Sequence, residues 1–386
     1  MIVTGDAAPF VELVAPDAAA THEAAWRDLG ARAAEANVFA EPEFVIPALR
    51  CFSKHKLCVL FVWRDAARRA MIGMMALRLP ASEFGVARVW QCNQAALPAM
   101  MFDRDAIDAA LQAALAGLAR EQPRIAGVLA PTLEKAGPAA SALQAVARRA
   151  NLALSTHHPR QRAALAPAKF AAQGIDARLE KKRTKEWARL RRRLAEGGAL
   201  TFAISSDASG IEPFLALEAQ GWKGARGTAL SADPALALFT RTMLQNFAAS
   251  GRLAIHRLDR AGTPVAIGVV LRGDRRAFYW KTAYDETFAA YSPGVQLTLD
   301  LSRALERDAF IALTDSCAIS DHPMIDRLWP ARLELIDCVI ATKPGAATGL
   351  SLWLKGEELR LGLREAAKRL VNKLRARYSP RAGRGG

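Results

Sequence analysis

Apolar residues follow helical and strand periods along most of the chain. In the first 165 residues, apolar positions three or four apart predict helices, and apolar runs bounded by polar or turn residues predict strands. The predicted helices are 21–36, 41–53, 103–120 and 139–150, the third capped by Asp103. The predicted strands are 57–63, 70–79, 86–92 and 125–130. This part therefore reads as a mixed α/β unit that ends near residue 165.

The same order of elements returns after residue 199. The predicted strands are 200–205, 252–258, 264–271, 276–284, 310–314 and 333–341. The predicted helices are 211–222, 234–249, 295–307 and 323–329. The turn at 259–263 is short and contains Gly262, which predicts a hairpin between its two flanking strands.

Two hairpins, at 57–78 and 253–272, also match residue by residue. Each has an apolar strand, an aspartate in the turn, an Ile-Gly pair and a closing Leu-Arg pair, with a one-residue difference across the turn. The shared order of elements and this match predict two copies of one α/β fold. The second copy carries the informative motifs, so we expect the first to be largely structural.

The positive charge is concentrated in two segments. The chain has 53 Lys and Arg against 38 Asp and Glu, a net charge of +15. Residues 178–193 hold nine basic and two acidic side chains, and residues 355–386 hold ten basic and three acidic ones. The rest of the chain is nearly neutral, so these two segments are expected to face an anionic partner.

The C-terminal segment has the pattern of an amphipathic helix. Its apolar stripe consists of Leu359, Leu363, Ala367, Leu370, Leu374 and Tyr378. Its flanking cations are Arg360, Arg364, Lys368, Lys373, Arg375 and Arg377. Such a helix, over 350–378, can lie in an anionic membrane surface, or it can pack on the protein with a solvated basic rim. The sequence leaves both readings open.

The middle basic segment favours an interdomain arm over a nucleic-acid site. Leu179, Trp187, Leu190 and Leu194 form a partial stripe with cations almost all round. No nucleic-acid motif accompanies them, and a single Trp is a poor platform for stacking bases. Nucleic acid is therefore disfavoured as a partner, with tRNA kept as the alternative.

The cysteine pattern and the start of the chain indicate a cytoplasmic protein. The five cysteines contain no CxxC pair and no zinc-like alternation with His, so no metal site is expected. The first 17 residues lack the basic start and apolar stretch of a signal peptide, and no window reaches about 18 uninterrupted apolar residues. Peripheral binding at the inner face of the cytoplasmic membrane fits the basic C-terminal segment.

Two polar clusters of the second half are candidate binding sites. Trp222 and Lys223 stand at a predicted helix end. There the Trp222 ring can form one wall of a substrate site and Lys223 can supply a positive charge. The alternative is an ordinary helix C-cap. Lys281, Tyr284 and Asp285 leave a strand. A small-residue turn then opens a helix, which suits a phosphate or pyrophosphate, and its residues are Ser292, Pro293, Gly294, Val295 and Gln296.

The third cluster, 314–326, follows an apolar strand, where α/β folds gather polar site groups. His322 is a candidate general base, and Asp315 and Asp321 are candidates for holding its tautomer. The alternative reading makes Asp321 a helix cap and His322 a surface residue. Cys317 as a nucleophile is a further option, although no sequence feature shows a depressed thiol pKa.

The order and spacing of these motifs resemble the FemAB-like, CelD-like branch of the GNAT acyltransferase superfamily. The matching run includes Leu217-Glu218, Trp222-Lys223-Gly224, the hairpin 251–266, Lys281, Tyr284-Asp285, Ser292-Pro293-Gly294 and Asp315. The resemblance covers about residues 178–342, and the first half looks like a degenerate duplicate. It implies an α/β fold of tandem GNAT-like domains, with mixed, mostly antiparallel sheets flanked by helices. The implied segments are domain 1–165, basic arm 166–198, catalytic domain 199–345 and basic helix with tail 346–386.

The resemblance implies acyl transfer from acyl-CoA to an amine, with the donor's pyrophosphate near the helix start at Val295. FemAB-like proteins use aminoacyl-tRNA instead, and a non-catalytic RNA- or membrane-binding adaptor that keeps the fold is a further alternative. Many relatives have a Tyr-Lys pair where this chain has Met324-Ile325. We therefore expect His322 to take over proton transfer, with Lys281 or Tyr284 orienting the acceptor or protonating the leaving group. The expected acceptor is a lipid-linked or other envelope amine, for instance a long-chain amine or a polysaccharide precursor.

Overall fold

The computed structural model describes residues 8–52, 56–80, 85–170, 174–357, 359–360 and 363. The elements of the first half are β1 (Phe10–Val14), α1 (Glu23–Ala31), α2 (Pro42–Phe52), β2 (Leu57–Trp63), β3 (Met71–Arg78), β4 (Gly85–Val89), β5 (Met100–Phe102), α3 (Ile107–Glu121), β6 (Ile125–Glu134), α4 (Pro138–Arg149) and β7 (Leu154–Leu165). The connecting elements are α5 (Ile175–Arg178) and α6 (Lys181–Ala195). The elements of the second half are β8 (Leu200–Ser205), α7 (Ile211–Gln220), α8 (Trp222–Ala225), α9 (Pro234–Ala249), β9 (Leu253–Arg260), β10 (Thr263–Arg272), β11 (Arg276–Tyr284), α10 (Pro293–Arg307), β12 (Leu313–Asp315), α11 (Ile325–Leu328) and β13 (Ala331–Ala341).

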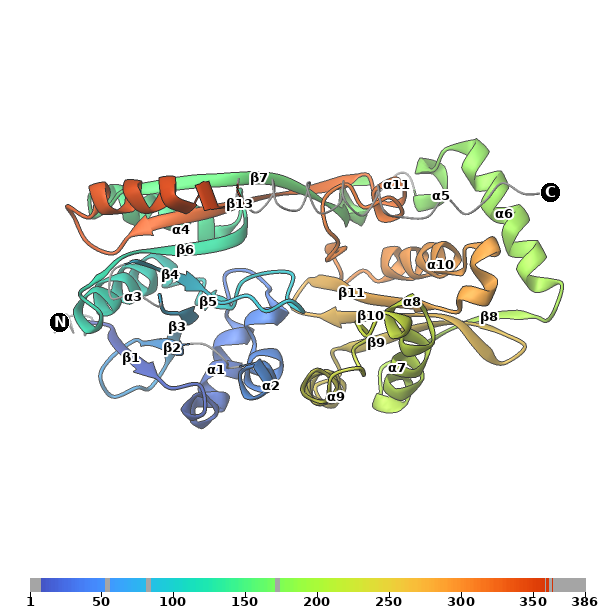
Figure 1. Ribbon diagram of the computed structural model, residues 1–386, viewed down its shortest axis with the longest axis horizontal. Helices are drawn as coiled ribbons and strands as arrows, with labels where there is room; N and C mark the ends of the chain where they lie inside the picture. Colours follow the sequence, from blue (N-terminus) through green and yellow to red (C-terminus); the bar gives the residue numbers. More distant parts are fainter. Residues whose placement is uncertain are drawn as a thin grey trace, which may run out of the picture.

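The strands form one large sheet that runs through both halves (Figure 1). Its order is β1-β2-β3-β4-β6-β13-β7-β12-β11-β10-β9-β8, and β5 pairs with β3. The pairs β4/β6 and β11/β12 are parallel, whereas the other named pairs are antiparallel. The mixed, mostly antiparallel α/β fold expected from the sequence is therefore confirmed.

The two halves repeat one arrangement and exchange their last strands. β2, β3 and β4 are followed by α3 and the parallel strand β6, just as β9, β10 and β11 are followed by α10 and β12. β13, from the end of the second half, lies between β6 and β7 of the first half. On its other side, β7 pairs with β12 of the second half. The division of the chain into four predicted segments stays a prediction, because each half is completed by a strand of the other.

The sequence missed one strand and was wrong about two helix starts. No element was predicted between residues 150 and 165, where β7 lies, because this strand carries mostly polar residues and therefore lacks an apolar signal. The helix expected at 21–36 is a 3₁₀ turn (Ala18–His22) followed by α1, which ends at Ala31. Asp103 caps no helix, because it is buried and its carboxylate accepts a hydrogen bond from Arg32 at 2.9 Å.

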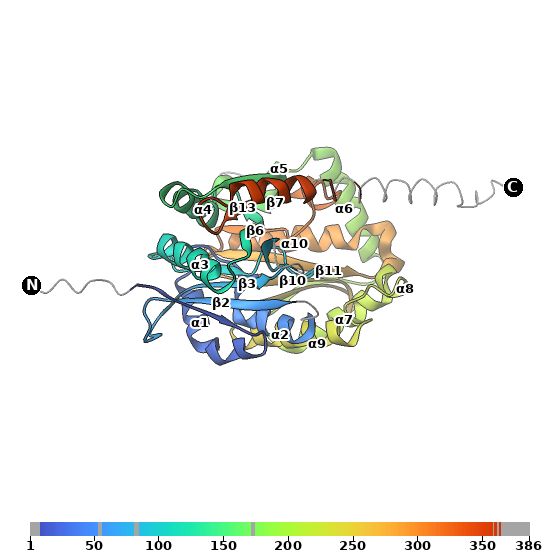
Figure 2. The same ribbon diagram turned by 60° about the vertical axis from the view of Figure 1, so that its left-hand side comes forward.

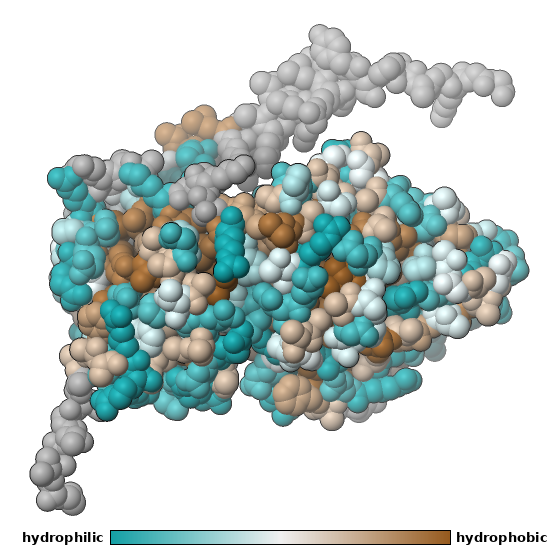
Figure 3. All heavy atoms as spheres, turned by 90° about the horizontal axis from the view of Figure 1, so that it is seen from below, coloured by the Kyte–Doolittle hydropathy of each residue, from teal (hydrophilic) through white to brown (hydrophobic). Residues whose placement is uncertain are grey.

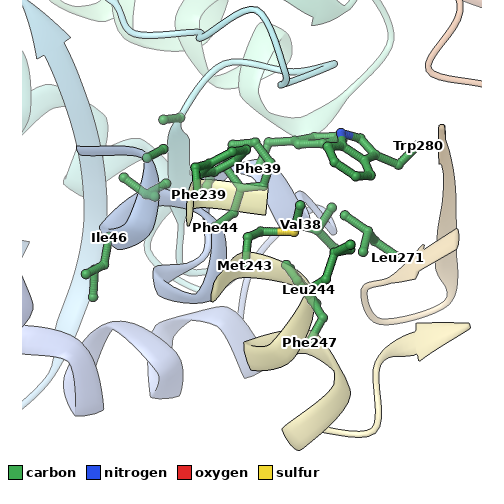
Figure 4. Packing of buried hydrophobic residues seen from close by; sticks show 14 of the residues in the cluster. Val38, Phe39, Phe44, Ile46, Phe239, Met243, Leu244, Phe247, Leu271 and Trp280 are labelled. Carbon is green, nitrogen blue, oxygen red and sulfur yellow. The ribbon is translucent and has the colours of Figure 1, made fainter. Parts of the chain in front are cut away.

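One hydrophobic core joins the halves on one face of the sheet, where α1 and α2 of the first half lie beside α7 and α9 of the second (Figures 1 and 2). Phe44 of α2 meets Phe239 of α9 edge to face, with ring centroids 5.3 Å apart, and Phe39 meets Phe278 of β11 in the same way. Figure 4 shows this cluster, with Trp280 reaching it from β11. The opposite face has separate cores, one under α3 and α4 and one under α10.

Two basic helices pack on the outside of the sheet. α6 lies against α10, where Arg191 pairs with Asp300 at 2.9 Å and Leu194 is buried. Residues 347–357 are helical, and Leu350 and Trp353 pack on the outer face of β4, β6 and β13. The predicted stripe from Ala367 to Tyr378 lies outside the described residues.

The described residues include no helix that is both long enough and apolar enough to cross a membrane. Seen from the α2 and α9 side, the surface carries separate patches of hydrophobic residues between hydrophilic ones (Figure 3).

Candidate active site

The parallel strands β11 and β12 separate at the point where the site begins. They pair from Arg276 opposite Leu313 to Phe278 opposite Asp315, where β12 ends while β11 continues to Tyr284. The register of β11 on β10 shifts there, so that Trp280 is one extra residue in the strand. The Trp280 Nε1 donates to the carbonyl oxygen of Gln94 in the first half at 2.8 Å. The bulge thus fixes where the next side chain, Lys281, leaves the strand.

Lys281 lies where the two halves meet. Its ammonium is 5.5 Å from the centroid of the Trp280 ring, and it forms no ion pair with a carboxylate of the described residues. Burial, and then the nearby charge of Lys223, lowers the pKa of Lys281 below its usual value of 10.5, with Glu218 opposing. Because its pKa is lowered, a larger fraction of Lys281 than of a surface lysine is neutral at a given pH, and the neutral amine can accept a proton.

Two thiols lie near Lys281, one from each half. Cys317 follows β12 and has a left-handed backbone, with φ of 54°. Burial raises the pKa of Cys317 well above 9.0 and raises the pKa of Cys92 to about 11. Both thiols therefore stay protonated near neutral pH, which disfavours Cys317 as a nucleophile.

A small hollow close to Lys281 is lined by two residues predicted to bind substrate, Lys223 and Tyr284. The Lys223 ammonium donates to Glu218 at 2.7 Å, and the other oxygen of Glu218 accepts from the Leu230 N–H at 2.7 Å. Glu218 is buried and holds the loop after α7 in place. Trp222 begins α8 at the same loop.

Asp315 is buried and engaged with arginines rather than with His322. Its carboxylate accepts from Arg162 of β7 at 3.0 Å and from Arg276 of β11 at 3.3 Å. It also accepts from the backbone N–H of Cys317 at 2.8 Å. Arg276 continues this chain of charges to Glu134 in the first half. Asp315 therefore ties β12 to the strands on either side of it.

His322 and Asp321 lie at the start of α11. The Nδ1 of His322 faces the N–H groups of Met324 and Ile325, at 3.3 and 3.4 Å. An Nδ1 that accepts hydrogen bonds places the proton of the neutral ring on Nε2. Asp321 is exposed and has a left-handed φ of 57°. No hydrogen bond between these two side chains is found.

The start of α10 is partly closed. The Gln296 N–H makes the ordinary first hydrogen bond of the helix, to the carbonyl oxygen of Ser292 at 3.2 Å, and the Val295 N–H, which would otherwise be free, donates to the same oxygen at 3.0 Å. The Gln296 amide donates to the carbonyl oxygen of Trp187 in α6 at 2.9 Å, and Pro293 has no N–H to offer. Gly294 is buried under the ring of Tyr284. This helix start offers fewer free N–H groups than an open one.

Asp285 caps the 3₁₀ helix Glu286–Tyr291 by accepting from the backbone N–H of Thr287 at 2.9 Å. Of the predicted site residues, the structure thus brings together Lys281, Lys223 and Tyr284. His322 and Asp285 make local structural contacts, and Asp315 makes long-range contacts with Arg162 and Arg276.

A larger groove adjoins the site from the first half. It has a volume of about 680 Å³ and runs between α2, the start of α9 and the segment after β4. Its lining includes Cys92 and Gln94, which neighbour Lys281 and Trp280 respectively. Sequence reasoning missed this groove, because its residues are far from the second-half motifs along the chain and carry no motif of their own.

The described residues hold no group of three or more His, Cys, Asp or Glu side chains that could bind a metal ion. All five cysteines are free thiols.

The comparison with known families decides the class of the second half. Residues 181–313 match the Acetyltransferase (GNAT) domain family. This part of the chain is therefore similar to GNAT acetyltransferase domains. Lys281 and the opening between β11 and β12 lie in the matched region, as does the start of α10. No curated protein matches the sequence.

Solved structures share the fold of nearly the whole chain. The C-terminal domain (DUF2156) of a putative lysylphosphatidylglycerol synthetase from Agrobacterium fabrum has a TM-score of 0.52 at 11% identity, covering 86% of this chain and 94% of that one. FemX has a TM-score of 0.52 at 11% identity, covering 85% and 96%. The fold of nearly the whole chain therefore has counterparts among solved proteins. The GNAT resemblance predicted from the motifs for about residues 178–342 agrees with the family match over 181–313.

Proposed function

We propose that the protein is an N-acyltransferase that uses acyl-CoA to acylate an amine of a lipid-linked or other envelope acceptor. The observation that supports this most is Lys281, an unpaired lysine of lowered pKa at the strand opening of a GNAT domain. A protein titled as a lysylphosphatidylglycerol synthetase shares the fold, which favours a lipid acceptor over a free small molecule.

In the proposed reaction, the acceptor amine attacks the thioester carbonyl, a C–N bond forms and the C–S bond breaks. Lys281 takes the proton that the amine loses and delivers it to the departing thiolate, so that the lysine ends each cycle neutral. Lys223 and Tyr284 border the small hollow beside Lys281 and orient the acceptor. Backbone N–H groups of the separated strand stabilise the oxyanion.

This proposal gives proton transfer to Lys281 in place of His322, which the sequence favoured. His322 faces two helix N–H groups through Nδ1, whereas Lys281 lies at the strand opening. Lys281→Met should lower kcat by about 100-fold or more if the lysine carries the proton. His322→Ala should leave kcat unchanged and destabilise the fold by about 1 kcal/mol, as loss of a helix cap does.

Steady-state kinetics of both variants, with thermal unfolding as the control for folding, separate the two assignments. A 100-fold loss in His322→Ala with full activity in Lys281→Met would return the base to His322. Wild-type protein that turns over no donor and acceptor pair would favour the non-catalytic adaptor.

The partly closed start of α10 favours a second candidate donor, an aminoacyl-tRNA. The Val295 N–H is occupied and Pro293 has no N–H, and α6 covers Gln296 with many exposed basic side chains alongside. Thermal shift of the full chain with acetyl-CoA, long-chain acyl-CoA, free CoA and tRNA distinguishes the donors. Stabilisation by acyl-CoA supports the first proposal, and stabilisation by tRNA alone supports the second.

We also propose that the protein binds the inner face of the cytoplasmic membrane through segment 350–378. The described start of this segment exposes Leu352, Leu359 and Leu363, each with more than 60% of its surface accessible. Their spacing places them along one side of a helix, beside exposed Arg360.

A further inference from the structure

A cationic groove separates the C-terminal helix from the first half of the sheet. It has a volume of about 540 Å³, and its walls come from the end of β3, the start of β4 and the helix that begins at residue 347. Its charged lining consists of Lys56, Arg78, Arg88, Arg360 and Glu357. Its apolar lining consists of Leu79, Pro80, Val86, Leu129 and Trp353. The groove therefore offers both cationic groups and apolar surface to a ligand.

Arg78 and Arg88 are arranged in a way that folding does not explain. They face each other across the β3/β4 pair, where like charges destabilise a sheet. Both are exposed, and neither forms a hydrogen bond or ion pair with a side chain of the described residues. Among the described lining residues, Glu357 is the one carboxylate, and Arg360 engages it in a bidentate pair. The hydrogen bond to Arg360 lowers the pKa of Glu357, and the charge of Arg88 also contributes to lowering it. Four cations against one carboxylate in this described lining leave an excess of positive charge for an anion.

The groove also leads toward Lys281. Arg78 and Arg88 line both this groove and the 680 Å³ groove, so the two meet at this arginine pair. The second groove ends at Cys92 and Gln94, the residues of the first half that neighbour Lys281 and the Trp280 indole. A ligand held by its anion at the arginines can extend one part toward the reaction site and another along Leu79 and Trp353.

From this arrangement we infer that the groove is the acceptor site and that it binds the phosphate of a phospholipid-type acceptor that carries the amine to be acylated. Two guanidinium groups on neighbouring strands suit a phosphate, which accepts paired N–H hydrogen bonds. The apolar wall suits the first part of an acyl or glycerol chain, and the exposed leucines of the C-terminal helix border the membrane from which such a lipid comes. The first half thus contributes binding, beyond the structural role expected from its sequence. This inference rests on the proposed acyl transfer, whose acceptor class it names.

The test uses the full chain and a soluble lipid, dihexanoyl phosphatidylglycerol below its micelle concentration, with binding measured by calorimetry. The double charge reversal Arg78→Glu with Arg88→Glu should weaken binding about tenfold or more, because it removes two charge-assisted contacts. The matched control, Arg64→Glu with Arg327→Glu, changes the net charge equally at two exposed arginines outside the groove. It should weaken binding less than twofold. An equal loss of lipid affinity in both double variants would contradict the proposed site, because it would reflect only the change in net charge.

Two further probes identify the ligand class. Dihexanoyl phosphatidylcholine should bind more weakly than dihexanoyl phosphatidylglycerol, and glycerol 3-phosphate should bind at least tenfold more weakly, because it lacks the apolar part. Glycerol 3-phosphate that binds as well as the lipid would overturn a lipid site in favour of a free-phosphate site. The neutral pair Arg78→Gln with Arg88→Gln repeats the test if the charge reversal does not fold.

Failure here is distinguishable from failure of the proposed function. Acyl transfer by the wild-type protein to a small soluble amine tests the proposed catalysis without the groove, because such an acceptor has no phosphate for Arg78 and Arg88 to bind. Lipid binding that depends on the two arginines, together with small-amine transfer by the wild type, supports both the groove and the proposed catalysis. Small-amine transfer absent in the wild type while lipid binding depends on the arginines would reject the proposed catalysis and keep the groove as a binding site.

Discussion

At the junction of the halves, single side chains are held by partners that lie far away along the chain. Asp315 stands at a strand end, as a site residue would, yet it is fully buried between Arg162 and Arg276. Its position after an apolar strand could be predicted. Its partners could not, because Arg162 belongs to β7, whose polar residues gave no strand signal. The sequence pointed to Lys281 because it lies close to Tyr284 along the chain. Its surroundings, which include the Trp280 ring and residues from both halves, are set only by the fold.

His256 is a buried histidine whose ring nitrogens have no hydrogen-bond partner. Burial, followed by the charge of Arg272, lowers the pKa of His256 from 6.5 to about 3. Between these two values the unfolded chain binds a proton that the folded chain does not, so the free energy of unfolding rises with pH across this window. Acidification from pH 7 to pH 5 should cost about 2 kcal/mol through this residue.

His256→Leu should remove that part of the pH dependence. Urea unfolding at pH 5 and pH 7 measures it as the difference between wild type and variant, which cancels the opposite contribution of Glu35 and Glu41, whose pKa values are raised to about 7. The same loss on acidification in both proteins would show that His256 is not the group responsible.

At the scale of elements, apolar periodicity predicted most strands and helices of the second half. The strands β8 and β11 have the bounds expected from the sequence, since each is an apolar run between clear turn residues. The hairpin between β9 and β10 turns on Ala261 and Gly262, both with positive φ, as its glycine predicted. Apolar periodicity did not predict β7, which has few apolar residues, or β1, which is only five residues long.

The C-terminal helix is the element on which membrane binding is expected to depend. A chain that ends after Leu350 keeps that buried residue and loses exposed Leu352, Leu359 and Leu363 together with the basic segment. Co-sedimentation with vesicles containing phosphatidylglycerol should therefore fall about tenfold or more, because each lysine or arginine near an anionic surface contributes about 1 kcal/mol.

Thermal unfolding of the truncated chain serves as its control, since Val86, Leu129 and Val339 keep Leu350 as a packing partner. Undiminished vesicle binding by a folded truncated chain would move the membrane surface to another part of the protein.

At the scale of the whole molecule, the halves are interdependent. β13 is hydrogen-bonded between β6 and β7, and α2 and α9 share one core. A fragment of residues 1–165 would leave β6 and β7 without the strand between them and would expose Phe39 and Phe44. We expect this fragment alone to show no cooperative thermal transition, because unpaired strand edges and exposed aromatic groups do not support a stable sheet.

Mixing or coexpressing residues 1–165 with residues 166–386 should restore a cooperative transition, since the pair supplies every strand. Circular dichroism during heating measures it for each fragment and for the mixture. A cooperative transition in 1–165 alone would contradict the interdependence of the halves.

The sequence by itself determined the fold class, the repeat and the resemblance of the second half to GNAT domains, because these follow from local periodicity and from motifs of neighbouring residues. It also named Lys281, Lys223 and Tyr284, which share a short stretch of structure around β11. Only the tertiary structure decided that the last strands are exchanged, that Asp315 is sealed between two arginines, and that Arg78 and Arg88 oppose each other beside the C-terminal helix. Those arrangements join residues far apart in the chain, and strand pairing and burial set them rather than any pattern along the sequence.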